Sequence, residues 1–233
     1  MEEKKRIAVA LSREKAGHTI LGLLAAGSIW GFSEVVLGAV LKASGLPLRS
    51  AILTGVGLGI MGVAVSGLTA SPALLGVVLV AVLCKQLVVP IQHVPFMCAA
   101  NSSLAVLLEG SALTAVAATI RNNLDRRLVI RVGTGAFAAL LAAGAFYFAG
   151  MRLAPCPYLR SFARRGGMGA FTLAEGLPWA VFSGVLFPVG YRLGESLRAF
   201  DTGRRQTRLY DGVSGALTVV CIAASALAFA LGY

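Results

Sequence analysis

Four ionisable side chains of this sequence lie inside long apolar runs, where a charge is costly. The four are Glu34, Lys85, Glu109 and Glu175. Amide and imidazole side chains accompany them at Gln86, Gln92, His93 and Asn101. A charge at the centre of a lipid bilayer costs about 2.5 to 3.5 kcal/mol on insertion scales, so such residues usually face a polar cavity or an oppositely charged partner. Their types therefore indicate either a site for a polar solute or buried ion pairs.

The composition of the chain indicates a membrane protein. Of its 233 residues, 57% are hydrophobic and only 13% are charged, and the mean hydropathy is +0.81. A soluble fold of this length has too little interior to bury that much apolar surface. The 28 glycines agree with this interpretation, because small residues let helices approach closely in a membrane. We expect an all-α fold, a polytopic transmembrane helical bundle of six to seven spans.

Seven apolar runs are long enough to cross the hydrocarbon core, which needs about 20 residues per helix. They cover Gly17 to Leu41, Ser50 to Leu68, Ala73 to Val89, Ala99 to Ile120, Val132 to Met151, Phe171 to Tyr191 and Gly212 to Leu231. No repeat divides them, so residues 1–233 are expected to form a single integral membrane domain. Residues 1–16 would be a cytoplasmic N-terminal segment and residues 17–233 the helical bundle.

The distribution of basic residues predicts the orientation of the spans. Lys and Arg concentrate in the N-terminal segment and in the segments 121–131 and 192–208, and short cytoplasmic loops retain positive charge. We therefore expect a multi-pass protein of the cell inner (plasma) membrane with its N-terminus in the cytoplasm. The segment from Arg152 to Gly169 carries four arginines on the outer side. Either it folds back over the mouth of the bundle or one span is miscounted.

In this orientation the polar residues gather in the outer half of the membrane. Glu109 lies about two helical turns deeper than Asn101 and would form the floor of a pocket. The sequence therefore predicts an outward-facing cavity of mixed charge that binds a small polar solute. Its predicted lining residues are Glu34, Trp30, Lys85, His93, Asn101, Glu109, Glu175 and Trp179. The alternative is that Lys85 neutralises Glu34 or Glu109 inside the bundle, while the tryptophans anchor the membrane interface.

Small residues recur on the first predicted span. Gly22 and Ala26 form one pair four residues apart, and Gly27 and Gly31 form a second. Such residues let another helix come close, either within the bundle or from a partner protein.

Motifs for catalysis and metal binding are missing from the sequence. Gly212-Val213-Ser214-Gly215 has the GxSG form used by rhomboid proteases, but no histidine follows it. The four cysteines show no metal-ligand spacing, and only Cys156 is expected in a loop. The net charge of +11 comes from clusters between apolar runs, which are typical of membrane topology signals. We expect no enzyme, no catalytic residues, no metal, no cofactor and no nucleic acid partner; membrane lipid surrounds the bundle.

Two segments of the N-terminal half resemble the substrate-binding S components of energy-coupling factor transporters. They are Gly27-Ser28-Ile29-Trp30-Gly31-Phe32-Ser33-Glu34 and Pro47-Leu48-Arg49-Ser50-Ala51-Ile52-Leu53-Thr54. The resemblance implies a small bundle, typically of six helices, that binds a vitamin, precursor or metal near the outer side. It also implies docking of the first helix onto a transmembrane coupling protein served by ATPase subunits.

Carried onto this chain, the resemblance implies a role for each group of residues. The docking face would consist of Gly22, Ala26, Gly27 and Gly31. The solute site would be lined by Glu34, Lys85, Asn101 and Glu109. The seventh predicted span and the absence of the usual alanine-rich docking motif depart from the family pattern, and the lack of an N-terminal Met-His start argues against a metal as the solute.

The sequence thus predicts a substrate-binding component of a membrane transport system. It would capture a small solute of vitamin or precursor type from the outer side and rely on partner subunits for energy. The alternative from another class is a non-catalytic structural subunit or scaffold of a larger membrane complex, whose buried charges are structural ion pairs.

Overall fold

The computed structural model of the chain describes residues 19–67, 71–86, 96–200 and 204–230. These residues are almost entirely helical and include no strand. In chain order the elements are the helix of residues 19–32, the π-helical turn η1 (Ser33–Leu37), α2 (Gly38–Ala43), α3 (Arg49–Gly67), α4 (Ser71–Gln86), α5 (Phe96–Leu124), α6 (Leu128–Leu153), α7 (Pro157–Arg164), α8 (Gly167–Phe171), the π-helical turn η2 (Thr172–Gly176), α9 (Leu177–Phe200) and α10 (Arg204–Ala230).

The predicted fold class is confirmed. Five helices of the described residues are long and apolar enough to cross a membrane: Thr19–Ala43, Arg49–Gly67, Ala100–Leu124, Leu128–Leu153 and Gly167–Ala199. Two shorter apolar helices, Ala73–Gln86 and Asp211–Leu227, coincide with the third and seventh predicted runs. The chain is an all-α membrane protein whose helices match the seven apolar runs.

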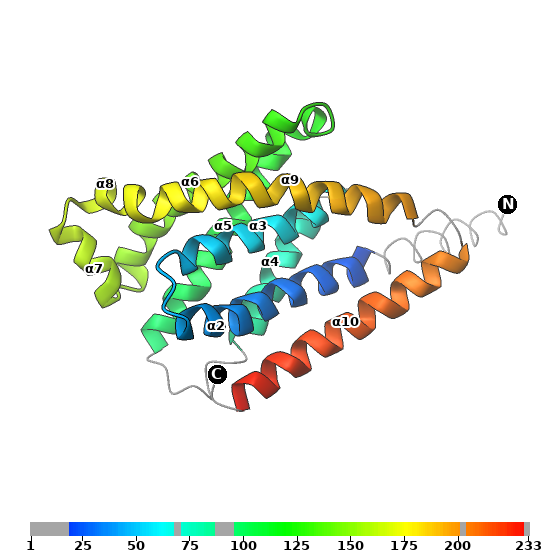
Figure 1. Cartoon of the computed structure of the whole chain (residues 1–233), viewed down its shortest axis with the longest axis horizontal. Helices are drawn as coiled ribbons and strands as arrows, with labels where there is room; N and C mark the ends of the chain where they lie inside the picture. The colour runs from blue at the N-terminus through cyan, green and yellow to red at the C-terminus, as the bar shows by residue number, and fades with distance from the viewer. Residues whose placement is uncertain (1–18, 68–70, 87–95, 201–203, 231–233) are drawn as a thin grey trace, which may run out of the picture.

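The first helix, α3 and α9 run between two ends of the molecule, whereas the hairpin of α5 and α6 projects upward from them (Figure 1). One end contains the turn between α2 and α3 together with α7 and α8, and we call it the α7 end. The opposite end contains the start of the first helix, the end of α9 and the start of α10. Gly45 has a φ of +68° in the turn between α2 and α3, a left-handed conformation that glycine adopts without strain.

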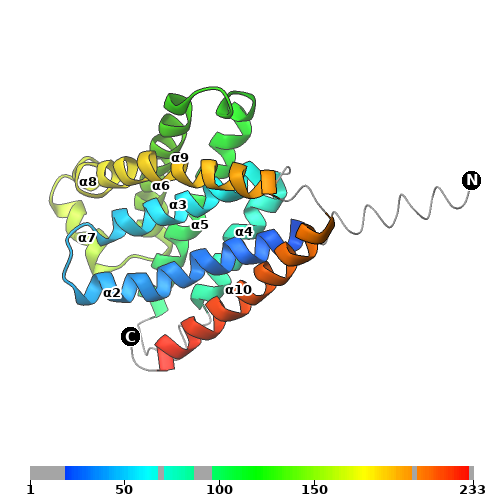
Figure 2. The same cartoon turned by 45° about the vertical axis from the view of Figure 1, so that its right-hand side comes forward.

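Glycines bring α3 and α9 into direct contact, and the two helices lie side by side in Figures 1 and 2. A Cβ atom on Gly190 would lie only 1.8 Å from the carbonyl oxygen of Gly59, and one on Gly194 would lie 1.9 Å from Ser66 Oγ. Backbones this close require residues without side chains, as in tightly packed membrane helices. This contact, which joins the second and sixth predicted spans, is the most extensive one between helices among the described residues.

The last helix, α10, lies on the outside of the bundle next to the first span (Figure 2). Its buried residues are small: Ser214, Cys221 and Ser225. Large apolar residues such as Val219 and Val220 are exposed instead. A helix with its small polar side inward and its apolar side outward is adapted to lipid and not to water. The predicted seventh run is therefore a helix of the membrane bundle.

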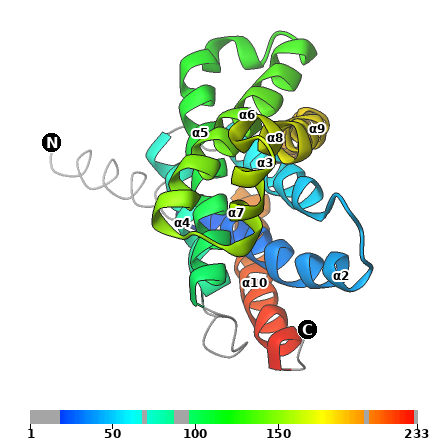
Figure 3. The same ribbon diagram turned by 90° about the vertical axis from the view of Figure 1, so that its left-hand side faces the viewer.

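The arginine-rich segment between α6 and α9 folds back across the α7 end. Its short helix α7 buries Leu159 and Phe162 and exposes Arg160 and Arg164. Figure 3, which faces this end, shows α7 in front of the bundle. An amphipathic helix of this kind suits a membrane interface. Of the two explanations for the four arginines, the fold supports a segment that folds back.

Candidate functional site

Glu34 and Lys85 form an ion pair between the first span and α4. Lys85 Nζ lies 2.5 Å from Glu34 Oε2, and the two side chains are only 15% and 6% exposed. The next residue of α4, Gln86, donates from Nε2 to Ser103 Oγ of α5 at 2.7 Å. The carboxyl-terminal end of α4 is therefore linked by polar side chains to both the first span and α5.

Glu34 and Glu175 both lie in π-helical turns, which interrupt otherwise regular helices. In η1 the Gly38 N–H donates to the Ser33 carbonyl five residues earlier, and in η2 the Leu177 N–H donates to Thr172. Such turns insert one extra residue into a helix and often mark functional positions. Here each extra residue changes the direction in which a carboxylate projects.

Glu109 is the most enclosed of the four predicted ionisable residues. It lies at the middle of α5, about 20 Å along the helix from Phe96, and only 4% of the residue is exposed. Glu109 Oε1 is hydrogen-bonded to Thr54 Oγ1 of α3 at 2.9 Å. The charges of Glu34 and Lys85 also act on Glu109.

Glu175 joins α9 to the start of α3 and to α7. Ser50 Oγ donates to Glu175 Oε2 at 2.5 Å, and the Tyr158 hydroxyl donates to Glu175 Oε1. Partial burial, this hydrogen bond and the negative charge of Glu175 raise the pKa of Tyr158, while the positive charge of Arg49 lowers it. Tyr158 therefore stays protonated and keeps donating to Glu175 over the whole physiological pH range.

One face of α3 connects the two carboxylates. Ser50 and Thr54 are four residues apart and share a helix face; Ser50 contacts Glu175 and Thr54 contacts Glu109. The polar groups thus follow a path from Tyr158 at the α7 end to Glu109 in the middle of the bundle. Neither serine nor threonine was among the residues predicted from the sequence, because both are common in membrane helices and carry no charge.

Asn101 does not point toward this group. Its Nδ2 donates to Cys156 Sγ at 3.5 Å, and its Oδ1 lies near Gly150 of α6. Asn101 therefore fastens the start of α5 to the segment that follows α6. Cys156, the cysteine expected in a loop, is buried in this contact.

The two tryptophans are core residues in this conformation. Trp30 is fully buried between Gly57 of α3 and Gly110 of α5. Trp179 is 4% exposed and lies against the rings of Phe146 and Phe171. Neither ring is open to a solute, and neither lies at the surface as an interface anchor would. His93, also predicted to line the site, lies outside the described residues.

The small-residue face of the first span is partly used within the bundle. A Cβ atom on Gly27 would lie 2.5 Å from Val80 Cβ, and one on Gly31 would lie 2.4 Å from Cys84 Cβ. These two glycines therefore seat α4 against the first span, which was the intramolecular alternative. Gly22 and Ala26 are half-buried.

A second polar cluster, which sequence reasoning missed, lies at the opposite end. Arg131 of α6 makes two hydrogen bonds to the Glu195 carboxylate, at 3.1 and 3.2 Å, and donates from Nε to the Leu124 carbonyl at 2.7 Å. Its guanidinium also covers the ring of Tyr191 at 4.3 Å, and the Tyr191 hydroxyl donates to Asp125 at 2.6 Å. The cluster locks the α5–α6 turn onto α9.

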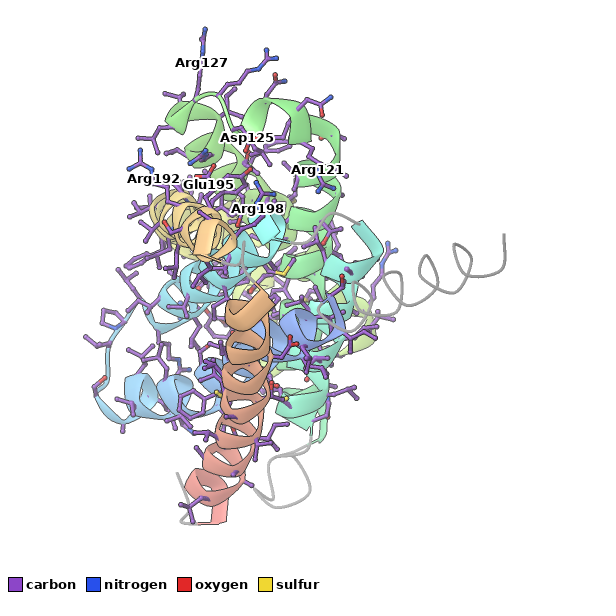
Figure 4. All side chains as sticks on the ribbon, turned by 90° about the vertical axis from the view of Figure 1, so that its right-hand side faces the viewer. Arg121, Asp125, Arg127, Arg192, Glu195 and Arg198 are labelled. Carbon is purple, nitrogen blue, oxygen red and sulfur yellow. The ribbon has the colours of Figure 1, made fainter. Side chains whose placement is uncertain are left out.

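Exposed arginines surround this second polar cluster. Figure 4 shows Asp125 and Glu195 near each other and Arg127 extending away from the protein. Arg126, Arg192 and Arg198 are exposed as well. Arg131 was counted only as a topology signal; its position three residues inside a membrane helix could have marked it as a buried cation with a partner.

Comparison with family models, curated proteins and solved structures finds no match to this chain. Among the described residues, no group of three His, Cys, Asp or Glu side chains is placed to hold a metal ion. The candidate site therefore consists of the Glu34–Lys85 ion pair together with Glu109, Glu175 and the hydroxyls of Ser50, Thr54 and Tyr158.

Proposed function

We propose that this chain is the solute-binding subunit of a membrane transport system. It captures a small polar solute from the outer side and relies on partner subunits for energy. The observation that carries the proposal is a path of polar side chains from α7, η2, α3 and α5 that leads from the α7 end to Glu109 in the middle of the bundle. The buried ion pair between η1 and α4 adds two further charges that act on Glu109.

The cost of this arrangement supports a role in binding. Each charged group inside a membrane costs about 2.5 to 3.5 kcal/mol unless it is compensated. The contact between α3 and α9 is made by glycines and apolar side chains, so this contact does not require the carboxylates of the candidate site. Glu109 has no charged hydrogen-bond partner among the described residues, so its presence in the core is not explained by ion pairing.

The proposal includes the orientation of the protein. The α7 end, where Tyr158 and Glu175 begin the polar path, would face the outside of the inner (plasma) membrane. The opposite end carries the exposed Arg126, Arg127 and Arg192, and would lie with the N-terminus in the cytoplasm.

The resemblance to S components of energy-coupling factor transporters supplies the class of solute and of partners. The solute would be a vitamin or precursor, and the partners a transmembrane coupling protein and ATPase subunits. Because α4 covers Gly27 and Gly31, docking in the present conformation would use Gly22 and Ala26 on the remaining part of that face.

The 2.5 Å contact between Lys85 and Glu34 favours the second candidate, a structural subunit of a larger membrane complex. In that case the pair only neutralises itself and no solute competes for it. The two functions differ in what the purified protein binds, so one experiment separates them.

The experiment is native mass spectrometry of the full chain purified in mild detergent, followed by a thermal-shift screen with vitamins and their precursors. A retained solute, and a stabilisation that grows with ligand excess, are expected for a transport subunit; at 100 times the Kd the gain is about 2.7 kcal/mol. K85M should abolish the shift, whereas K42M, a matched change at an exposed lysine of α2, should preserve it. Fixed partner subunits without any solute response would establish the scaffold instead.

A further inference from the structure

Thr54 cannot supply the hydrogen for both of the hydrogen bonds that it makes. Thr54 Oγ1 lies 2.9 Å from the Ser50 carbonyl oxygen and 2.9 Å from Glu109 Oε1. A threonine hydroxyl has one hydrogen to donate, while its oxygen can accept from another donor. One of the two contacts therefore contains a hydrogen that belongs to the other residue. A backbone carbonyl has no hydrogen, so only Glu109 can provide it.

Other threonines of this chain show which contact uses the Thr54 hydrogen. Thr114, Thr134 and Thr218 each donate to the carbonyl four residues earlier, at 2.8, 2.6 and 2.9 Å. This bond is common for threonine inside helices. Thr54 makes the same bond to Ser50, so the hydrogen between Thr54 and Glu109 lies on the Glu109 carboxyl group.

The second oxygen of Glu109 leads to the same conclusion. Oε2 is buried and has no hydrogen-bond donor among the described residues. An ionised carboxylate only accepts hydrogen bonds, and burying one without donors is very costly. The other two carboxylates of the site differ, because Glu175 receives two hydroxyl donors and Glu34 receives the Lys85 ammonium. Those two are satisfied when ionised, and Glu109 is satisfied when protonated.

The charges around Glu109 come from two sides. Glu34 of η1 and Lys85 of α4 act on it, with opposite signs, and α3 presents the uncharged Thr54. The remaining neighbour of α5, α6, carries its basic residues near its ends, at Arg131 and Arg152. Since Lys85 is held by Glu34, none of the basic residues named above is free to neutralise an ionised Glu109 within the part of the chain that the structure describes.

We propose that Glu109 is a proton-binding site in the middle of the membrane, with the proton on Oε1 and donated to Thr54. The proton-binding site can be confirmed or refuted separately from solute transport, because the experiment uses no solute.

The test is infrared difference spectroscopy of the full chain in lipid at neutral pH. The wild type minus E109Q spectrum should contain the carbonyl band of a protonated carboxyl group, and the band should shift in heavy water. T54V should move that band to higher frequency, because the carboxyl group loses its hydrogen-bond acceptor. E195Q, a change to a glutamate in the separate Arg131 cluster, is the control and should leave the band in place.

Three outcomes would contradict the proposal. A wild type minus E109Q spectrum that contains carboxylate bands would show that Glu109 is ionised. If E109Q fails to fold, wild type labelled with carbon-13 glutamate gives the answer directly, because a spectrum without any protonated glutamate band excludes a proton on Glu109. A band that T54V leaves unmoved would show that the proton of Glu109 is not donated to Thr54, which contradicts the proposed position of the proton.

Discussion

Replacing Lys85 alone should destabilise the protein more than replacing Lys85 and Glu34 together. The ammonium and the carboxylate are 2.5 Å apart and nearly buried, so K85M leaves a carboxylate without its partner. Removing one member of a buried pair costs about 3 to 5 kcal/mol, whereas replacing both by uncharged groups is often neutral. We expect K85M to lose about 3 kcal/mol of unfolding free energy and K85M/E34Q to lose less than about 1 kcal/mol.

The ordinary pKa of glutamate gives an independent upper limit for the unfolding free energy that K85M loses. A carboxylate without a partner can take up a proton, and protonating an ordinary glutamate at pH 7 costs about 3.7 kcal/mol. K85M can therefore lose at most this much unfolding free energy. This upper limit decreases by about 1.4 kcal/mol for each pH unit below neutrality. In E34Q the unpartnered group is a lysine, whose deprotonation at pH 7 costs about 4.6 kcal/mol. The unfolding free energy that E34Q loses should instead become smaller as the pH rises.

The assay is unfolding of each variant in mixed micelles with increasing sodium dodecyl sulfate, followed by tryptophan fluorescence at acidic, neutral and alkaline pH. Both tryptophans are buried, so their emission reports loss of the core. K42M changes an exposed lysine and should stay within about 0.5 kcal/mol of wild type. If K85M and K85M/E34Q are equally stable, or if the single variants share the same pH trend, Lys85 and Glu34 are not a buried pair.

Further predictions concern the contact between α3 and α9, the phenol of Tyr158 and the Arg131–Glu195 cluster. G190A should cost about 3 kcal/mol or more, because its methyl group meets the Gly59 carbonyl, whereas G133A, with open space around it, should be neutral or stabilising in the same assay. E175Q should lower the raised pKa of Tyr158 in an ultraviolet titration; an unchanged titration would mean that burial alone sets it. R131M should cost about 1 to 3 kcal/mol, a range discounted for the partly exposed Glu195, and R131K should recover only part of this because it cannot form both hydrogen bonds.

The helical elements could be predicted from the sequence because membrane spans follow a simple rule. A run of about 20 apolar residues crosses the bilayer, and every backbone group in it must be hydrogen-bonded within the helix. The run predicted from Ser50 to Leu68 is the helix Arg49–Gly67, and the run from Val132 to Met151 is Leu128–Leu153. The helix α7 was not predicted, because its eight residues give no span and their arginines were counted only as topology signals.

The sequence by itself determined that the helices of this protein lie in a lipid membrane and that some of them carry charged residues. It did not determine which charges meet. Lys85 could have paired with either Glu34 or Glu109, and the tertiary structure selects Glu34, while Ser50 and Thr54 acquire their roles only because α3 lies between α5 and α9. Trp30, expected at the wall of a cavity, is buried because Gly57 and Gly110 leave room for its ring. The reason is that hydropathy depends on each residue alone, whereas pairing depends on the rotation of each helix, which glycine contacts and the two π-helical turns set.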